Sequence, residues 1–397
     1  MDMDFIKRAN AICNEYLLKT EKYYEMNRNR WFSDFVGHFR NVCFQVCKLQ
    51  GEGNLTAMSY IEYTMLYTNI IRRQYVADIF VYGGRSYLDK EQHFVGSYDI
   101  SFLFFYYNML WEDLLYLRKR YAGRVTAREI VAFMLQGIPD FYSYLAPIAR
   151  FSIAKSVEGI EYMEGSGMNS LANIDKNEVF MVNVGGYMST VETVYQEVKN
   201  KNADRLAKWF GERFCDTYFF GDYCYLEFEG KSFMNTDFRF AQFCSSTLNN
   251  TNLKGSSLIG ANFRGAVMEG CCLDYCSIHE ADFSYAILKN ANIRDAHAKT
   301  GLIDEKVWKF PGFLPARFCN ADLTGADFSG SILIGASFVG AILTGTKFTA
   351  TNLTGADFTG ATIRDTDFSG ATLDGASFVN TAVDNAIVGE DSSMCNS

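Results

Sequence analysis

Residues 321–345 read ADLTGADFSGSILIGASFVGAILTG, which is five consecutive units of five residues. Each unit begins with a small residue, has a large apolar residue third and ends in Gly. A period of five fits neither the 3.6-residue helix nor the two-residue alternation of a strand. On extended backbone the small and the large residue point the same way, so a turn must follow in every unit.

The same frame extends well beyond this stretch. Large apolar residues recur every five positions from Phe233 to Ile293, and again from Phe318 to Val383. Four turns close a coil, so about twenty residues make one rung, and stacked rungs pair through parallel backbone hydrogen bonds. From residue 318 onward the central residues alternate between Phe and an aliphatic residue, so Phe rings should stack on two opposite faces. The predicted core residues of this second run are Phe318, Leu323, Phe328, Leu333, Phe338, Leu343, Phe348, Leu353, Phe358, Ile363, Phe368, Leu373 and Phe378.

These units resemble the A-(D/N)-(L/F)-x-x unit of the pentapeptide-repeat family. Ala321–Gly325 and Ala356–Gly360 match it residue for residue, and the resemblance covers residues 225–388. It implies a right-handed quadrilateral β-helix, with the small and the central residues inside and the other three positions outside.

The first half of the chain has a different composition. Of 24 Tyr, only Tyr275 and Tyr285 lie beyond residue 225. We predict a mostly α-helical domain over residues 1–222, with at most one small β element. Its predicted elements are a buried helix over 55–82, a helix over 98–121, a capping box at Thr126–Glu129, a short strand at Val179–Val184 and a helix over 187–213. The fold class is therefore α + β in two domains, with the repeat coil over 223–388 and a flexible tail over 389–397.

Residues 299–315, KTGLIDEKVWKFPGFLP, interrupt the repeat without shifting its frame. They either continue the coil in degenerate form or leave it as a loop. We favour the loop, because Lys306 and Trp308 do not suit a narrow dry core. On such a loop Trp308, Phe310 and Phe313 are candidate partner contacts, since aromatic residues dominate interface hot spots. Alternatively, they fold back and cover the flank of the coil or the helical domain.

Charge and cysteine usage exclude several classes of protein. The net charge is −9 with no basic run, which argues against binding to nucleic acid or to an anionic membrane surface. The apolar stretch at Ile100–Trp111 is too short to span a bilayer, and the N-terminus lacks the order of a signal peptide. Eleven scattered Cys without a disulfide-scaffold spacing indicate reduced thiols and a cytoplasmic protein.

No residue set indicates a metal or cofactor. Cys271, Cys272, Cys276 and His279 have zinc-like spacing, but the coil frame turns the first and third inward and the other two outward. We interpret His38, Cys43 and Cys47 as packing residues. No nucleophile, acid–base or phosphate-binding motif is present. The most site-like segment of the first half contains Arg85, Asp89 and Asp99, as a weak candidate for a polar pocket, with an ordinary loop as the alternative.

These features favour a non-enzymatic interaction or scaffold protein that presents a rigid rod to another protein. An alternative comes from the resemblance: some family members mimic DNA and protect DNA gyrase or topoisomerase IV from poisons. Against it, no outward face of the second run is an unbroken stripe of acids, because Arg317 and Lys347 interrupt two of the faces. A second alternative is an enzyme within residues 1–222 with the repeat as a targeting arm.

Overall fold

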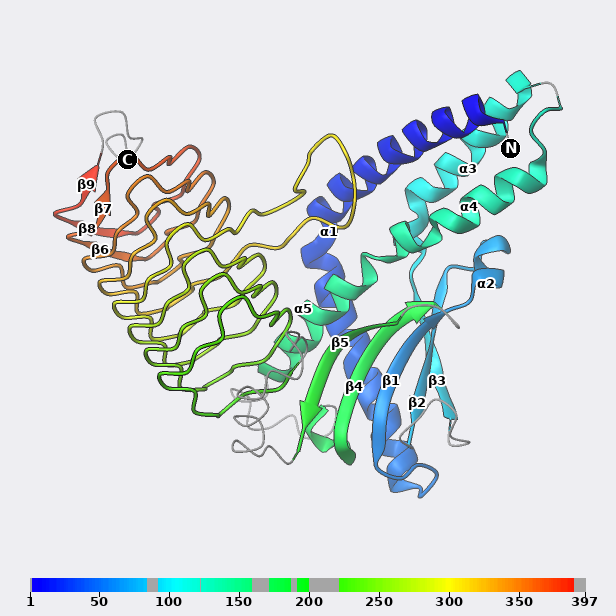
Figure 1. Cartoon of the computed structure of the whole chain (residues 1–397). Helices are drawn as coiled ribbons and strands as arrows, with labels where there is room; N and C mark the ends of the chain where they lie inside the picture. Colours follow the sequence, from blue (N-terminus) through cyan, green and yellow to red (C-terminus); the bar gives the residue numbers. More distant parts are fainter. Residues whose placement is uncertain are drawn as a thin grey trace. The chain divides into compact units, whose positions relative to one another are not determined.

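A computed structural model describes residues 2–83, 92–121, 123–158, 171–186, 191–199 and 221–388 (Figure 1). The chain divides into two compact units. The first is Met1–Asn200 together with Asp304–Pro311, and the second is Lys201–Ile303 with Gly312–Ser397. Within the described residues, no helix combines the length and the apolar character needed to cross a bilayer.

The first unit is built on one long helix, α1 (Met3–Gly51), which begins where the Asp2 carboxylate accepts hydrogen bonds from the backbone of Asp4 and Phe5. Its buried side chains are largely aromatic, and they pack against α3 and α5. The other helices are α2 (Tyr67–Ile71), η1 (Ser101–Phe104), α3 (Phe105–Arg118), η2 (Lys119–Tyr121), α4 (Ala127–Tyr142), α5 (Leu145–Glu158) and η3 (Leu171–Asn173).

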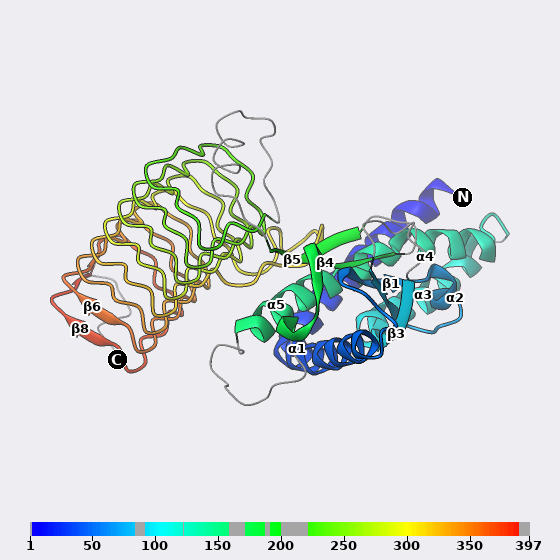
Figure 2. The same cartoon turned by 90° about the horizontal axis from the view of Figure 1, so that it is seen from below.

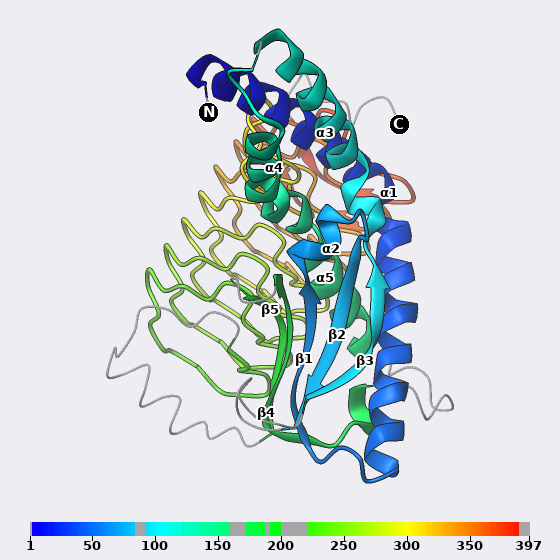
Figure 3. The same ribbon diagram turned by 90° about the vertical axis from the view of Figure 1, so that its right-hand side faces the viewer.

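A five-stranded sheet with the order β3-β2-β1-β4-β5 completes the first unit, and α1 packs against one face of this sheet, beside β3 (Figure 3). The phenyl ring of Phe35 in α1 lies 5.3 Å from the ring of Tyr63 in β1. Only the central β1–β4 pair is parallel, whereas the other three pairs are antiparallel. The strands are β1 (Met58–Met65), β2 (Val76–Tyr82), β3 (Gln92–Asp99), β4 (Lys176–Gly186) and β5 (Val191–Val198).

The sheet corrects the prediction of a mostly helical domain with at most one small β element. The predicted helix over 55–82 is wrong, because β1, α2 and β2 occupy it. Seven of the eight β1 residues are buried, so this strand is buried on both faces and the spacing of its apolar residues imitates that of a buried helix. In the predicted helix over 187–213, the described residues 191–198 form β5.

Other predicted elements are closer to the structure. The Thr126–Glu129 capping box is confirmed: the Glu129 backbone N–H donates to Thr126 Oγ1, and the Glu129 carboxylate accepts from the Thr126 N–H. The strand expected at Val179–Val184 lies inside the longer β4. The helix expected over 98–121 holds only from Phe105, since β3 ends at Asp99 and η1 follows.

The second unit is a coil of stacked rungs that follow one another in chain order (Figure 2). Parallel bridges join residues twenty apart, from Asp222 with Gln242 to Asp357 with Ser377. Short paired segments continue the ladder near its end: β6 (Thr362–Arg364) pairs with β8 (Ala382–Asp384), and β7 (Asp367–Phe368) pairs with β9 (Ile387–Val388). The repeat region is therefore a β-helical solenoid, with four five-residue units in each rung.

The interior of the coil contains the small and central residues of the units as one continuous core up to Leu373. In the last rung the predicted core residue Phe378 is only partly buried, and Val383 is exposed. The predicted Phe stacks are confirmed. The rings of Phe338 and Phe358 are 5.0 Å apart and nearly parallel, and the rings of Phe348 and Phe368 are 5.2 Å apart. Phe338 and Phe348 meet edge to face at 5.4 Å, which is a favourable geometry for aromatic rings.

Each unit turns at its last residue, where φ is positive. Gly is frequent there, and Asn takes the same conformation at the cost of some strain, as at Asn250 with φ 55°. A Cβ at Gly270, one rung later, would lie 2.7 Å from Asn250 Oδ1. The Asn side chain thus occupies the space above the Gly of the next rung, which explains why both residue types recur at this position.

Candidate functional site

One outward column of the coil differs from the other three. The residue just before each central residue points outward, and those of successive rungs are joined by bridges. In one column these residues are mostly aliphatic or β-branched, and we call it the aliphatic column. Its members are Glu227, Thr247, Val267, Ile287, Asp322, Ile342, Thr362 and Ala382. All are partly or fully exposed, with Ile342 at 42%.

The remaining columns are polar, and ion pairs join successive rungs within them or directly beside them. Arg294 Nη2 lies 2.7 Å from Asp274 Oδ2, and Arg317 Nη2 lies 2.8 Å from Asp282 Oδ2. Burial disfavours ionisation of Asp282, but the charge and hydrogen bond of Arg317 outweigh it and lower the pKa of this carboxyl. In each of these columns neutral or basic residues separate the acids, so there is no continuous row of acids and none of the columns has the potential of a DNA backbone.

The interruption leaves the coil at Gly301 and returns at Phe313. These two residues form an antiparallel bridge with hydrogen bonds of 2.8 and 3.0 Å. On either side of it, Asp282 pairs with Arg317 across 35 residues instead of twenty, so the ladder resumes in register. The imidazole of His279 lies 4.4 Å from the Phe313 ring, and the Leu314 N–H donates to Glu280 Oε1 at 3.0 Å.

Residues 304–311 belong to the first unit, where α1 binds their backbone. The Asn14 amide donates to Lys306 O at 3.0 Å and accepts from the Trp308 N–H at 3.0 Å. The Trp308 side chain is 8% exposed, and its Nε1–H donates to the Tyr144 hydroxyl at 2.8 Å. That hydroxyl donates to buried Glu21 Oε2 at 2.8 Å. Burial, the Glu21 charge and its hydrogen bond raise the pKa of Tyr144, so the phenol is neutral.

The three aromatic residues predicted as partner contacts therefore have different environments. Trp308 is an interior residue of the first unit, as in the fold-back interpretation of the segment. Phe313 packs at the base of the interruption beside His279. Phe310 is 40% exposed, so it is the one of the three with the most surface for a partner.

Of the three residues predicted to form a polar pocket in the first half, the structure describes only Asp99. Arg85 and Asp89 lie outside the described residues. The Asp99 side chain is exposed, and its Oδ1 accepts from the Ser101 N–H at 2.8 Å. This contact holds the backbone at the start of η1, which is a structural role.

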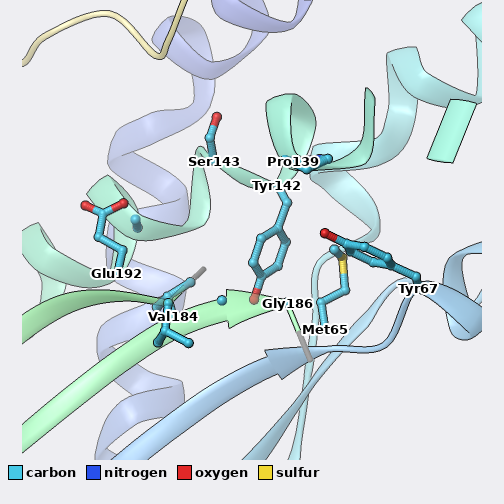
Figure 4. A pocket seen from close by; sticks show the side chains of 11 residues that line it. Met65, Tyr67, Pro139, Tyr142, Ser143, Val184, Gly186 and Glu192 are labelled. Atoms are coloured by element: carbon cyan, nitrogen blue, oxygen red, sulfur yellow. The ribbon is translucent and has the colours of Figure 1, made fainter. Parts of the chain in front are cut away.

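The structure contains a pocket that the sequence did not indicate. It has a volume of about 330 Å³ and lies at the carboxyl ends of the parallel strands β1 and β4, below the turn from α4 to α5 (Figure 4). Tyr67, Tyr142 and Met65 form one end, and Val184 and Glu192 the other. Pro139, Ser143, Ala146, Gly185, Gly186 and Val191 complete the lining.

Several polar groups of this pocket are already oriented. The Tyr142 hydroxyl donates to the Tyr63 carbonyl at 3.2 Å, and burial raises the pKa of Tyr142. The Glu192 carboxylate pairs with Arg150 of α5, whose side chain is 17% exposed. The Ser143 hydroxyl donates to Asp140 O at 2.6 Å. The available signal was the pair Gly185-Gly186 after the predicted strand Val179–Val184, but the sequence predicts helices where β1 and β5 lie.

Among the residues that the structure describes, no three His, Cys, Asp or Glu side chains are grouped to hold a metal ion. Cys271 and Cys276 are buried in the coil, and burial raises the pKa of Cys276 to about 12. His279 lies against Phe313, and burial lowers its pKa to about 4. His38 packs on the Tyr98 ring at 4.4 Å, and burial likewise lowers its pKa to about 4.

The matches to known protein families lie in the coil. Residues 313–387 match the model of a pentapeptide repeat region, and residues 236–274 and 261–297 match that of pentapeptide repeats in eight copies. No curated protein matches the chain.

Similar solved structures include HetL, a pentapeptide repeat protein involved in heterocyst differentiation regulation from the cyanobacterium Nostoc. It is 18% identical, with 49% of this chain and 99% of HetL covered and a TM-score of 0.22. A second is QnrB1, a plasmid-mediated fluoroquinolone resistance protein, at 16% identity, 44% and 84% coverage and a TM-score of 0.27. A third, from the Arabidopsis thaliana thylakoid lumen, is 18% identical, with 35% and 67% coverage and a TM-score of 0.14. Likenesses of this degree carry no argument about function.

Proposed function

We propose, from the premise that residues 236–297 and 313–387 are pentapeptide repeats, that this chain is a non-enzymatic interaction protein. In this proposal the repeat region, in the right-handed four-sided form of its family, is a rigid cytoplasmic rod that binds another protein. The observation that carries the proposal is the aliphatic column. It places exposed apolar side chains on a backbone that the stacked rungs hold in place.

The chemistry of this column suits the centre of a protein interface. Interface cores are depleted of charge and are surrounded by a polar rim. Ile287 and Ile342 lie on either side of Asp322 in the ladder, and Lys289 Nζ is 3.3 Å from Asp322 Oδ2, so this acid is neutralised. The other acid of the column, Glu227, lies at its first rung. The polar columns on the neighbouring faces provide the rim.

The test uses capture by the tagged full chain from lysate of its native host. Ile342→Lys places a charge in the column, whereas Thr372→Lys places one at the same unit position of another face, where the residue is also exposed. Both substitutions leave the interior of the coil unchanged. We expect a partner that is retained by the wild type and by Thr372→Lys and is lost with Ile342→Lys. Equal retention by both variants would exclude the column as the binding surface.

Protection of a topoisomerase is the alternative, and the charge pattern gives it no support. The column of Asp282 continues with Arg317 and Ser337, and that of Asp327 continues with Lys347. A supercoiling assay with purified gyrase and a quinolone tests this alternative directly. Rescue of supercoiling by the full chain would replace our proposal.

A further inference from the structure

We infer that the pocket at the carboxyl ends of β1 and β4 binds a small organic cation with an apolar body, such as an aromatic amine. This inference concerns the first unit alone and does not depend on what the coil binds. It rests on the position of the pocket in the sheet, on its aromatic walls and on its single acidic group.

The sheet topology opens a crevice at this position. β1 and β4 are parallel neighbours, but the chain continues from β1 to β2 on one side and from β4 to β5 on the other. In open α/β sheets, ligands bind outside the carboxyl ends of the strands, at the point where neighbouring connections leave to opposite sides. The pocket of about 330 Å³ is at the lower end of the range for small-molecule sites.

The lining selects an apolar body with a positive charge. Tyr67 and Tyr142 provide ring surfaces at one end, beside the polarizable sulfur of Met65 (Figure 4). Tyr142 is held by its hydrogen bond to the Tyr63 carbonyl, so its ring is preorganised. Among the described lining residues, Glu192 is the only charged one, and it lies at the other end of the pocket. An amine with an aromatic body would place its ring by the Tyr side chains and its ammonium by Glu192.

Arg150 limits the affinity of this pocket for a cation. Its guanidinium pairs with Glu192 but does not belong to the lining, so it competes with a ligand cation for the same carboxylate. Removing this competitor should therefore strengthen binding, whereas removing Glu192 should weaken it. A purely apolar cavity would respond to neither change.

Titration calorimetry of the full chain with phenethylamine, and with phenethyl alcohol as the neutral isostere, tests the inference. We expect the amine to bind about tenfold more tightly than the alcohol, as a charge-assisted contact would produce. Glu192→Gln should remove that preference, and Tyr67→Leu should weaken the amine several-fold through loss of the ring contact. Glu178→Gln, at an exposed acid of β4, is the matched control and should change nothing.

For Arg150→Gln we expect a higher affinity for the amine. A general loss of structure would lower the affinity, so this variant distinguishes the two causes. Thermal unfolding of each variant, without ligand, shows whether the first unit remains folded. Equal binding of amine and alcohol, no binding of either, or unchanged amine affinity in a folded Glu192→Gln variant would each overturn the inference.

Discussion

The repeat region and the first unit differ in whether the contacts between their side chains repeat along the chain. In the coil, a side chain contacts its equivalents twenty residues away, so each position meets nearly the same surroundings in every rung. In the first unit each contact occurs once, as between Tyr144 and Glu21, which are 123 residues apart. Because the contacts of the coil repeat, its structure can be predicted from its sequence. The contacts of the first unit occur once each, so this unit can form individual pockets and specific buried side-chain contacts.

We expect the largest loss of stability from a cavity in the coil. Phe348 is fully buried between Phe328 and Phe368, with ring distances of 5.1 and 5.2 Å. Phe348→Ala should lower the free energy of unfolding of the coil by about 3–5 kcal/mol, because the neighbouring rungs cannot close the space. Urea unfolding followed by circular dichroism measures this effect. Thr344→Ala, at an outward position, is the control and should stay within about 0.5 kcal/mol; a similar loss in both variants would contradict the account.

In the first unit, the equivalent experiment removes the Trp308 anchor. Trp308→Ala leaves a cavity and also leaves the Tyr144 hydroxyl without its Nε1–H donor, so we expect a loss of about 3 kcal/mol. Thermal unfolding monitored by near-UV circular dichroism follows this unit through its aromatic side chains.

Phe310→Ala serves as the control within the same segment, since that ring is partly exposed and should matter little. If Trp308→Ala were as mild as Phe310→Ala, the anchor would have no energetic role.

The stability of the first unit should also depend on pH, through the buried side chain of His38. Burial lowers the pKa of His38 to about 4, and its Nε2 has no hydrogen-bond partner among the described residues. The unfolded chain binds this proton near pH 6.5 and the folded chain only near pH 4, so stability falls as the pH drops between these values and changes no further below them. The loss is at most about 3 kcal/mol. His38→Phe should flatten the profile of urea midpoints between pH 6.5 and 4, and an unchanged slope would contradict this assignment.

Much of the coil could be predicted because five-residue periodicity has no competing interpretation. The stacks of Phe338 with Phe358 and of Phe348 with Phe368 follow from the alternation of Phe and aliphatic centres. The first unit could not be predicted equally well, since β1 is buried on both faces and its apolar run reads as a helix. The pocket could not be predicted from the sequence, because it depends on the pairing of β1 with β4, which are more than a hundred residues apart.

If the aliphatic column binds a protein, a charge placed in it must lower the affinity for the captured partner. Biolayer interferometry with the purified partner would compare the full chain with Ile342→Lys and Thr372→Lys. The account predicts at least about tenfold weaker binding for Ile342→Lys, as for a charge buried in an interface core, and unchanged binding for Thr372→Lys. Equal affinities for the two variants would contradict it.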